Sequence, residues 1–234
     1  GCDSVVCVFK VTPQAQGPAI KSLVNIYTFA DEHFEDQAIR IKKLYYKYKA
    51  RTIVIDGNGL GIGLVDYMIK SQEDENGDFF PDFGVENDDD GYYKKYRTAN
   101  TEFDAMYILK ANAPINTECH ANAQTQLQAG KVKFLIDERG AKEKLLATKM
   151  GQNMKPEERA EYLKPFTLTS ILKEEMMNLR EENEGVNIIL KQANRGIRKD
   201  KFSAFEYGLY YIKQEEDKKK KKKKFNAADW AFYN

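Results

Sequence analysis

One carboxylate, Asp56, lies where the sequence changes from an apolar run to a run of glycines. It follows the β-branched residues 53–55 and precedes four alternate glycines, which are Gly57, Gly59, Gly61 and Gly63. Short β-branched runs are typical of buried strands, and open α/β sheets bind ligands outside the carboxyl ends of such strands. Glycines permit positive φ and close approach of a substrate. The segment favours a functional acid at Asp56, although a flexible loop whose aspartate caps the next helix has the same pattern.

A second carboxylate, Asp200, lies in a basic segment near the carboxyl end of the chain. Within residues 191–201 it is accompanied by five cations, which are Lys191, Arg195, Arg198, Lys199 and Lys201. Two-metal hydrolysis of a phosphodiester needs converging carboxylates to hold the ions and cations to hold the phosphate backbone. Asp56 and Asp200 together favour that chemistry. Taken alone, Asp200 has an alternative role, in which it caps the start of an exposed helix. Clusters of charged residues are usually solvated, which is consistent with this alternative.

Several other kinds of site are excluded by the motifs that the sequence lacks. The glycines after Asp56 do not fit the dinucleotide fingerprint G-x-G-x-x-G, and the single Gly-Lys pair, at Gly130, is followed by Val132 rather than by Ser or Thr. The chain therefore carries no ATPase motor of its own. Three cysteines and two histidines are unclustered, which argues against a zinc site and a disulfide framework and fits a reducing cytoplasm.

The near-neutral charge of +1 hides a strong division along the chain. Lys218–Lys224 is an unbroken run of seven lysines, and removing these seven from the 37 basic residues leaves 30 against 36 acidic ones. The segment 72–92 is acidic and has no basic residue. Without the lysine run the chain is net acidic, so it needs a local strip of basic residues or a bound metal ion to bind DNA. No apolar run approaches the ~20 residues of a membrane span, which predicts a soluble protein.

The elements that would position the two acids form an α/β pattern. The sequence predicts a hairpin of Ser4–Val11 and Ile20–Phe29, and further strands at Ile53–Asp56, Ala105–Lys110, Lys131–Asp137 and Val186–Gln192. It predicts helices at Asp31–Lys49, Leu60–Lys70 and Thr117–Ala129, and a last helix that begins at Asp200. Between Pro156 and Arg180 the pattern is mostly helical and ends in TSILKEEMMNLREE.

The lysine run follows this last helix. Seven adjacent like charges repel one another, so we expect the run to be extended unless the apolar segment after it draws it into the helix. It acts either as a solubilising tail or as an electrostatic tether for DNA or for an acidic protein partner.

Six segments in order resemble the nuclease domain of the large terminase subunit of tailed bacteriophages, a member of the ribonuclease H-like superfamily. They are GCDSVVCVFKV, the block from NIYTFADEHF to LVDYMIK, YILKANAPINTE, KVKFLIDE, PFTLTSILKEEMMNL and RGIRKDKFSAFEYGLYY. The resemblance spans about residues 1–214, and IDGNGLG and RKDKFSA are its most specific parts.

The resemblance implies a metal-dependent endonuclease that cuts concatemeric double-stranded DNA during viral genome packaging. Asp56 and Asp200 match the family's central-strand and late-helix ligands for two Mg²⁺ or Mn²⁺ ions, and Asp3 matches an accessory acid. In the family, the first carboxylate lies on a strand that precedes the segment matched by Gly1 of this chain. The implied partners are double-stranded DNA, an upstream ATPase domain, the portal protein and the small terminase subunit, at the procapsid in the host cytoplasm.

The fold that the resemblance implies is a ribonuclease H-like α/β domain, a mixed sheet with helices on both faces that lacks the family's first strand. We expect this domain to cover residues 1–214, with an acidic insertion at 72–92, and a lysine-rich tail at 215–234. Two alternatives remain, a non-catalytic module that docks DNA or the portal, and a nuclease of the junction-resolvase type. The acidic insertion imitates half of a calcium loop, but Arg97 stands where a bidentate Glu is required, so a solvated insertion is expected.

Overall fold

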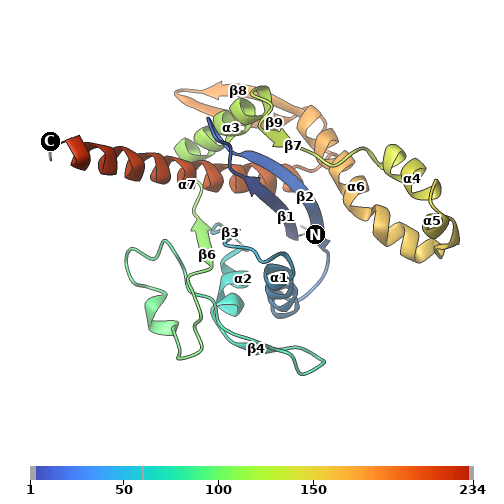
Figure 1. Cartoon of the computed structure of the whole chain (residues 1–234), viewed down its shortest axis with the longest axis horizontal. Coiled ribbons are helices and arrows are strands. Elements are labelled where there is room, and N and C mark those ends of the chain that lie inside the picture. Colours follow the sequence, from blue (N-terminus) through green and yellow to red (C-terminus); the bar gives the residue numbers. More distant parts are fainter. Residues whose placement is uncertain (1–3, 60, 232–234) are drawn as a thin grey trace. The chain divides into compact units, whose positions relative to one another are not determined.

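The computed structural model describes the backbone of residues 4–59 and 61–231, and the side chains as far as Lys221. These residues form two compact units (Figure 1). The central unit comprises Phe29–Asn112, and the terminal unit comprises Cys2–Thr28 and Ala113–Asn234. The architecture is mixed α/β, which confirms the predicted class; the ribonuclease H-like topology stays a prediction.

The central unit is built on two parallel strands, β3 (Ile53–Asp56) and β6 (Met106–Leu109). Val85 adds a parallel bridge to Met106 on the far side of β6. The sheet is accompanied by helices α1 (Phe34–Tyr48) and α2 (Gly61–Met68), the short hairpin of β4 (Gln72–Glu73) and β5 (Phe79–Phe80), and the 3-10 helix η1 (Lys94–Tyr96). The predicted strands at 53–56 and 105–110 are confirmed within a residue.

Helix α1 begins three residues later than its acidic start predicts. Asp31 has a positive φ of 54°, which takes the chain out of the helical region, and the His33 side chain then accepts a hydrogen bond from the Glu35 amide at 3.3 Å. The helix ends at Tyr48, where Lys49 adopts the left-handed conformation. Acidic residues in the first turn and Lys47 in the last match the helix dipole.

Two charged side chains are buried in the central unit. Lys42 of α1 is 0% exposed, and its ammonium donates to the carbonyl of Lys70 at 2.5 Å and lies 5.4 Å from the centre of the Phe83 ring. Burial lowers the pKa of Lys42 to about 8, and the neighbouring Asp82 opposes that shift. Asp82 accepts hydrogen bonds from hydroxyls of the surrounding loops. The acidic insertion therefore contributes to the core of this unit.

The terminal unit combines a three-stranded sheet with helices. The strands of this sheet are β1 (Ser4–Thr12), β2 (Ile20–Phe29) and β7 (Val132–Lys133), and β2 pairs with β7 in parallel. Its helices are α3 (Ala113–Gln128), α4 (Glu138–Leu146), α5 (Lys149–Asn153), α6 (Pro156–Met177) and α7 (Asp200–Ala231). A core of aromatic and aliphatic side chains joins α7 to the sheet: Phe9 of β1 lies 5.6 Å from Phe205, ring centre to ring centre.

The prediction that the helix before Val186 runs through LREE is wrong. Helix α6 ends at Met177, and Leu179–Glu184 forms strand β8, which pairs antiparallel with β9 (Asn187–Gln192). Asn178 closes the base of this hairpin, because its side chain exchanges two hydrogen bonds with the backbone of Asn194 at 2.9 and 2.8 Å. Gly185 supplies the positive φ of 62° that the turn requires.

The strand predicted over Lys131–Asp137 is also shorter than expected. Only Val132 and Lys133 pair with β2, because Asp137 instead caps the next helix through a 2.8 Å hydrogen bond from the Gly140 amide. Helices α4 and α5, which follow this cap, were not predicted. They pack on α6 around a small core of Ala141, Leu145 and Leu163.

The lysine run continues the long helix α7, which is the second of the two conformations that the sequence left open (Figure 1). The helix is fixed to the unit just before the run. Glu216 accepts from Ala19 at 2.8 Å and forms an ion pair with the buried Lys21 at 3.0 Å. From Lys218 onward the described side chains are exposed. Among the described residues, no helix is both long and apolar enough to cross a membrane.

Candidate functional site

The loop after β3 places Asp56 at the carboxyl edge of the central sheet. Gly61 lies directly over the Asp56 backbone: a Cβ on Gly61 would come within 1.7 Å of the Asp56 carbonyl oxygen. A Cβ on Gly57 would come within 2.5 Å of Ile108 on the neighbouring strand, and Gly59 has a φ of +57°. Each of the three glycines is therefore required, two by close packing and one by its backbone conformation.

Hydrogen bonds tie this loop to the end of β6. The Gly57 amide donates to the Leu109 carbonyl at 2.8 Å, and the Asn58 side chain donates to the Ala111 carbonyl at 2.9 Å. On the other side of β6, the amide side chain of Asn87 both donates to and accepts from the backbone of Ile108. The loop after Asp56 is therefore bonded to the end of β6, and the Asn87 side chain in turn holds β6 from its other side.

The Asp56 carboxylate itself is exposed at this edge. Its Oδ1 accepts a 3.0 Å hydrogen bond from the amide of Asn58, two residues on, which is an Asx turn. This bond fixes the carboxylate within the turn that precedes α2. An exposed acid on a rigid strand end can bind a cation, and the same bond has a purely local role in shaping the turn.

Asp200 lies in the first turn of α7, in the terminal unit. It is partly exposed, and its Oδ2 lies 4.0 Å from a guanidinium nitrogen of Arg198. The start of the helix is held by Glu175 of α6, which is 1% exposed and accepts from the Phe202 amide at 2.9 Å. Glu175 also pairs with the ammonium of Lys201 at 3.2 Å. Glu175 therefore satisfies one backbone amide of the turn on which Asp200 lies.

The predicted DNA-binding cations differ in their location: two lie on β9 and α7, and three lie in the connection between these elements. Lys191 pairs with Glu182 across the β8–β9 hairpin at 2.5 Å, and Lys201 is mostly buried against Glu175. Arg195, Arg198 and Lys199 are exposed in the connection between β9 and α7. These three are the cations best placed to meet a phosphate backbone.

Each candidate metal ligand is a single carboxylate in its own unit, Asp56 in the central one and Asp200 in the terminal one. Among the side chains that the structure describes, which end at Lys221, no three His, Cys, Asp or Glu gather as a metal centre would need. Asp3 lies outside the described residues. Asp56 and Asp200 are oxygen donors with accessible carboxylates, which suits the chemistry of Mg²⁺ and Mn²⁺.

The sequence analysis missed a buried acid–base pair between α3 and α7. His120 Nδ1 lies 2.6 Å from Glu206 Oε2, and burial raises the pKa of Glu206. In the sequence His120 looked isolated because its partner is 86 residues away. Tyr207 and Tyr210 add hydrogen bonds from α7 to Asn116 and Glu118 of α3, so this polar row fixes one helix to the other.

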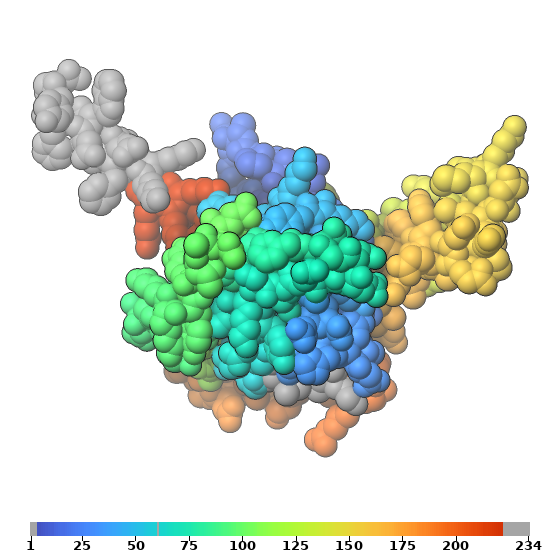
Figure 2. All heavy atoms as spheres, turned by 90° about the horizontal axis from the view of Figure 1, so that it is seen from below, coloured from blue at the N-terminus to red at the C-terminus, as the bar shows by residue number. Residues whose placement is uncertain are grey.

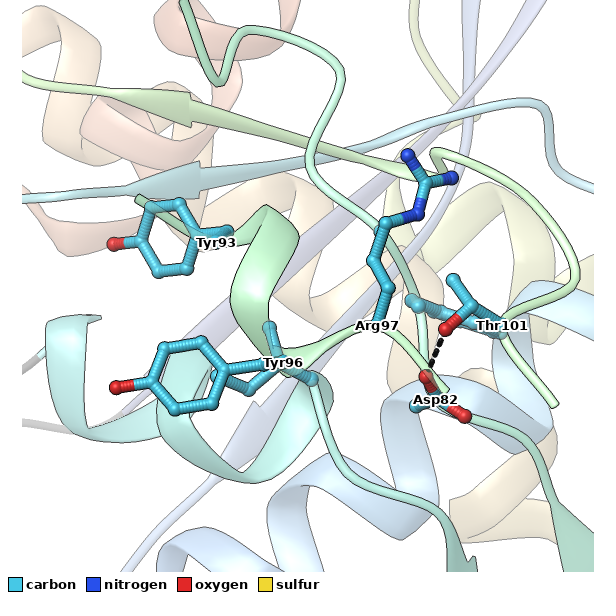
Figure 3. Close-up of a pocket in the computed structure, with 8 residues that line it drawn as sticks. Asp82, Tyr93, Tyr96, Arg97 and Thr101 are labelled. Atoms are coloured by element: carbon cyan, nitrogen blue, oxygen red, sulfur yellow. Dashed lines mark hydrogen bonds between the residues drawn. The ribbon is translucent and has the colours of Figure 1, made fainter. Parts of the chain in front are cut away.

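A small pocket in the central unit was missed as well. It is lined by Ile69, Asp82, Phe83, Gly84, Tyr93, Tyr96, Arg97 and Thr101 (Figure 3). Asp82 accepts from Thr98 at 2.9 Å and from Thr101, and these hydrogen bonds keep the pKa of Asp82 below its ordinary value despite its burial. The acid therefore organises the loop. The alternation of aromatic and basic residues in YYKKYR is the sequence signal that marks this region.

Comparison with protein-family models, with curated proteins and with solved structures finds no significant match to this chain.

Proposed function

We propose that the chain is the nuclease part of a viral genome-packaging terminase, a metal-dependent endonuclease that cuts concatemeric double-stranded DNA. The observation that carries the proposal is the position of Asp56, exposed at the carboxyl end of β3. Close packing at Gly57 and Gly61 and a hydrogen bond to the end of β6 position the backbone around Asp56. Such a strand end is where open α/β sheets place their reacting groups.

In this proposal Asp56 is a Mg²⁺ or Mn²⁺ ligand of the central unit and Asp200 is one of the terminal unit, each through its carboxylate oxygens. A divalent ion held by such carboxylates would supply an activated water for in-line attack on phosphorus and positive charge to stabilise the phosphate oxygens. Arg195, Arg198 and Lys199 would bind the phosphate backbone and neutralise its charge. Glu175 supports this arrangement, since it fixes the helix start on which Asp200 lies.

A second function, a DNA-docking module without catalysis, is favoured by one observation. The described residues supply single carboxylates rather than a group of three. In that case the exposed cations before α7 would bind DNA while Asp56 only shapes its turn. A junction-resolvase-type nuclease uses the same groups on branched DNA, and comparing branched with linear substrates separates it from the packaging nuclease.

Nicking of supercoiled plasmid in Mn²⁺ tests the proposal. We expect the chain to nick, and Asp56→Asn and Asp200→Asn each to abolish nicking, because each removes a metal anchor while keeping the shape of the side chain. Asp66→Asn is the matched control: Asp66 is an exposed acid on α2, within the same unit as Asp56. It should nick like the parent.

Two results would count against the proposal. Equal nicking by the parent and Asp56→Asn would show that Asp56 is not a ligand in the catalytic site. A parent that binds plasmid but never nicks it in either metal would favour the docking module. We also expect Mn²⁺ to support more nicking than Mg²⁺, because Mg²⁺ demands near-ideal octahedral geometry from its ligands.

A further inference from the structure

The last helix carries a run of lysines that the candidate nuclease site does not use. We define the lysine turn as residues 218–221, the four lysines of this run whose side chains the structure describes. All four are exposed, and the backbone stays helical as far as Ala231. The red end of α7 extends past α3 in Figure 1, and its last described part lies on the surface in Figure 2. The structure therefore presents these lysines on a helix rather than on an extended tail.

The helix is fixed to its unit immediately before the lysine turn. Glu216 accepts from the Lys21 ammonium at 3.0 Å and from the Ala19 amide at 2.8 Å. The Lys21 side chain is fully buried and also donates to Gln126 of α3 at 3.1 Å. These bonds join α7 to β2 and to α3 two residues before Lys218. The lysine turn therefore begins at a fixed point of the terminal unit.

Acidic residues before the lysine turn offset only part of its charge. Lys218 pairs with Glu215 at 2.9 Å, and Lys220 pairs with Asp217 at 3.4 Å. Both lysines are more than half exposed, and exposed ion pairs of this kind contribute little free energy, so a phosphate can replace the carboxylate at small cost. The sequence has no further acid until Asp229. Positive charge therefore accumulates along this part of the helix.

Helix geometry distributes these charges around the whole circumference of α7. An α-helix completes a turn in about 3.6 residues, so four consecutive lysines point to all sides of the axis. The helix rises about 1.5 Å per residue, and duplex DNA carries one negative charge per about 1.7 Å of its own axis. The two charge densities are therefore similar. A flat anionic surface would contact one side of such a helix, whereas a groove with anionic edges would contact several.

The major groove of DNA has the dimensions that such a helix needs. The groove is about 12 Å wide, and an α-helix with its side chains is about 10–12 Å in diameter. Both edges of the groove are phosphate strands, so lysines on opposite sides of the helix can each reach one. The major groove of duplex RNA is too narrow and deep for this arrangement. The all-round charge of the lysine turn therefore favours DNA over duplex RNA and over a flat membrane.

We propose that the lysine turn binds in the major groove of double-stranded DNA through contacts to phosphates on both edges. Phosphate contacts carry no sequence information, so this binding is independent of base sequence. Each contact releases condensed counterions from the DNA, which supplies the binding free energy. The inference deepens the proposed nuclease function and rests on it for the role of the contact, which is to hold the DNA that is cut.

Binding of the full chain to a fluorescein-labelled DNA duplex, followed by anisotropy in EDTA over a series of salt concentrations, tests the inference. The fourfold Lys→Gln variant of residues 218–221 should bind at least about tenfold more weakly at low salt. The slope of log affinity against log salt should become shallower by about three to four, because each lost phosphate contact removes about 0.9 from it. The fourfold Lys→Arg variant should bind like the parent, since all four charges remain.

A second fourfold Lys→Gln variant is the matched control. It replaces four exposed lysines of α4, α5 and α6 in the same unit and changes the net charge equally; they are Lys142, Lys144, Lys149 and Lys164. This control should keep the affinity and the salt slope of the parent. An unchanged salt slope in the lysine-turn variant would overturn the inference and leave the run as a solubilising element. An equal loss in the control would also overturn it.

Three other polyanions test the choice of partner. Phe225 and Trp230 follow the run in the sequence, and aromatic residues beside basic ones are typical of membrane-surface helices, so an anionic membrane is the main competitor. The probes are vesicles of phosphatidylcholine with phosphatidylserine, polyglutamate, and duplex RNA of the same sequence as the DNA. The loss of affinity in the lysine-turn variant should be largest for duplex DNA. An equal or larger loss for any of the three would overturn the assignment to the DNA groove.

The test is independent of catalysis, because EDTA removes divalent metal. Asp56→Asn should bind the duplex like the parent even if it loses nicking. If the chain proves unable to nick plasmid but the lysine-turn variant still loses duplex binding, the nuclease proposal fails and the binding role of the lysine turn stands. If nicking follows the two aspartates but the lysine-turn variant binds normally, the reverse holds.

Discussion

Lys42 offers the sharpest prediction about the energetics of the central unit. Its ammonium is fully buried, and burial lowers its pKa to about 8, against an ordinary value of 10.5. Between these two values the unfolded chain binds more protons than the folded one. The free energy of unfolding therefore rises with pH in this window. Going from pH 7.5 to pH 9.5 should add about 2 kcal/mol from this group alone.

The assay is urea unfolding followed by circular dichroism at the two pH values, with Lys42→Met beside the parent. Methionine keeps the linear stem but cannot titrate, so the variant should lack this increment. The comparison between variants is needed because burial raises the pKa of the thiols Cys7 and Cys119 to about 12. Those groups reduce stability as pH rises, equally in both proteins.

Lys43→Met is the control for this experiment. Lys43 is next to Lys42 on α1, but its side chain is 41% exposed and its ammonium pairs with Asp74 at 2.5 Å. That hydrogen bond raises the pKa of Lys43, so its titration lies above the window. The control should show the pH dependence of the parent. Identical pH dependence in the parent and Lys42→Met would refute the reasoning, because it would show that Lys42 keeps an ordinary pKa.

Two further predictions concern the backbone that positions the candidate acids. Gly61→Ala should destabilise the central unit by about 1–3 kcal/mol in urea unfolding and reduce Mn²⁺-dependent nicking, because its Cβ would meet the Asp56 carbonyl oxygen. Gly59→Ala is the comparison, because a Cβ on Gly59 would meet nothing within 4 Å. This variant loses only the stability that a positive φ costs an alanine, about 1–2 kcal/mol. Equal nicking by the Gly61→Ala and Gly59→Ala variants would contradict the steric argument. Glu175→Gln should lower the free energy of unfolding by about 2 kcal/mol, because it leaves the Lys201 ammonium without its ion pair beside the helix start. Glu174→Gln is the control, since Glu174 is the exposed neighbour, and it should leave the free energy of unfolding unchanged.

Local signals in the sequence account for much of the fold. The run before Asp56 is β-branched and the residues after it are glycines, so the strand, the turn and the following helix could all be predicted within a few residues. The start of α7 at Asp200 was predicted from an acidic residue followed by apolar residues at helical spacing. In each case residue types close to the boundary in the sequence marked it, although distant residues also stabilise it.

The failures come from interactions between residues distant in sequence. LREENE reads as helix because it is polar and continues an amphipathic pattern, yet pairing with β9 and the Asn178–Asn194 hydrogen bonds make it a strand. The burial of Lys42 and Asp82 had no local signal, because both are charged residues whose contacts come from other segments. The Glu175 cap of α7 was hidden in the same way, 27 residues from Phe202.

The central claim is that Asp56 binds a divalent metal. Titration of the chain with Mn²⁺, followed by the electron paramagnetic resonance signal of the free ion, measures this directly and does not depend on turnover. We predict that the parent and Asp66→Asn bind Mn²⁺ with the same affinity and that Asp56→Asn binds it at least tenfold more weakly, a difference of about 1.4 kcal/mol. Equal Mn²⁺ affinity in the parent and Asp56→Asn would contradict the account.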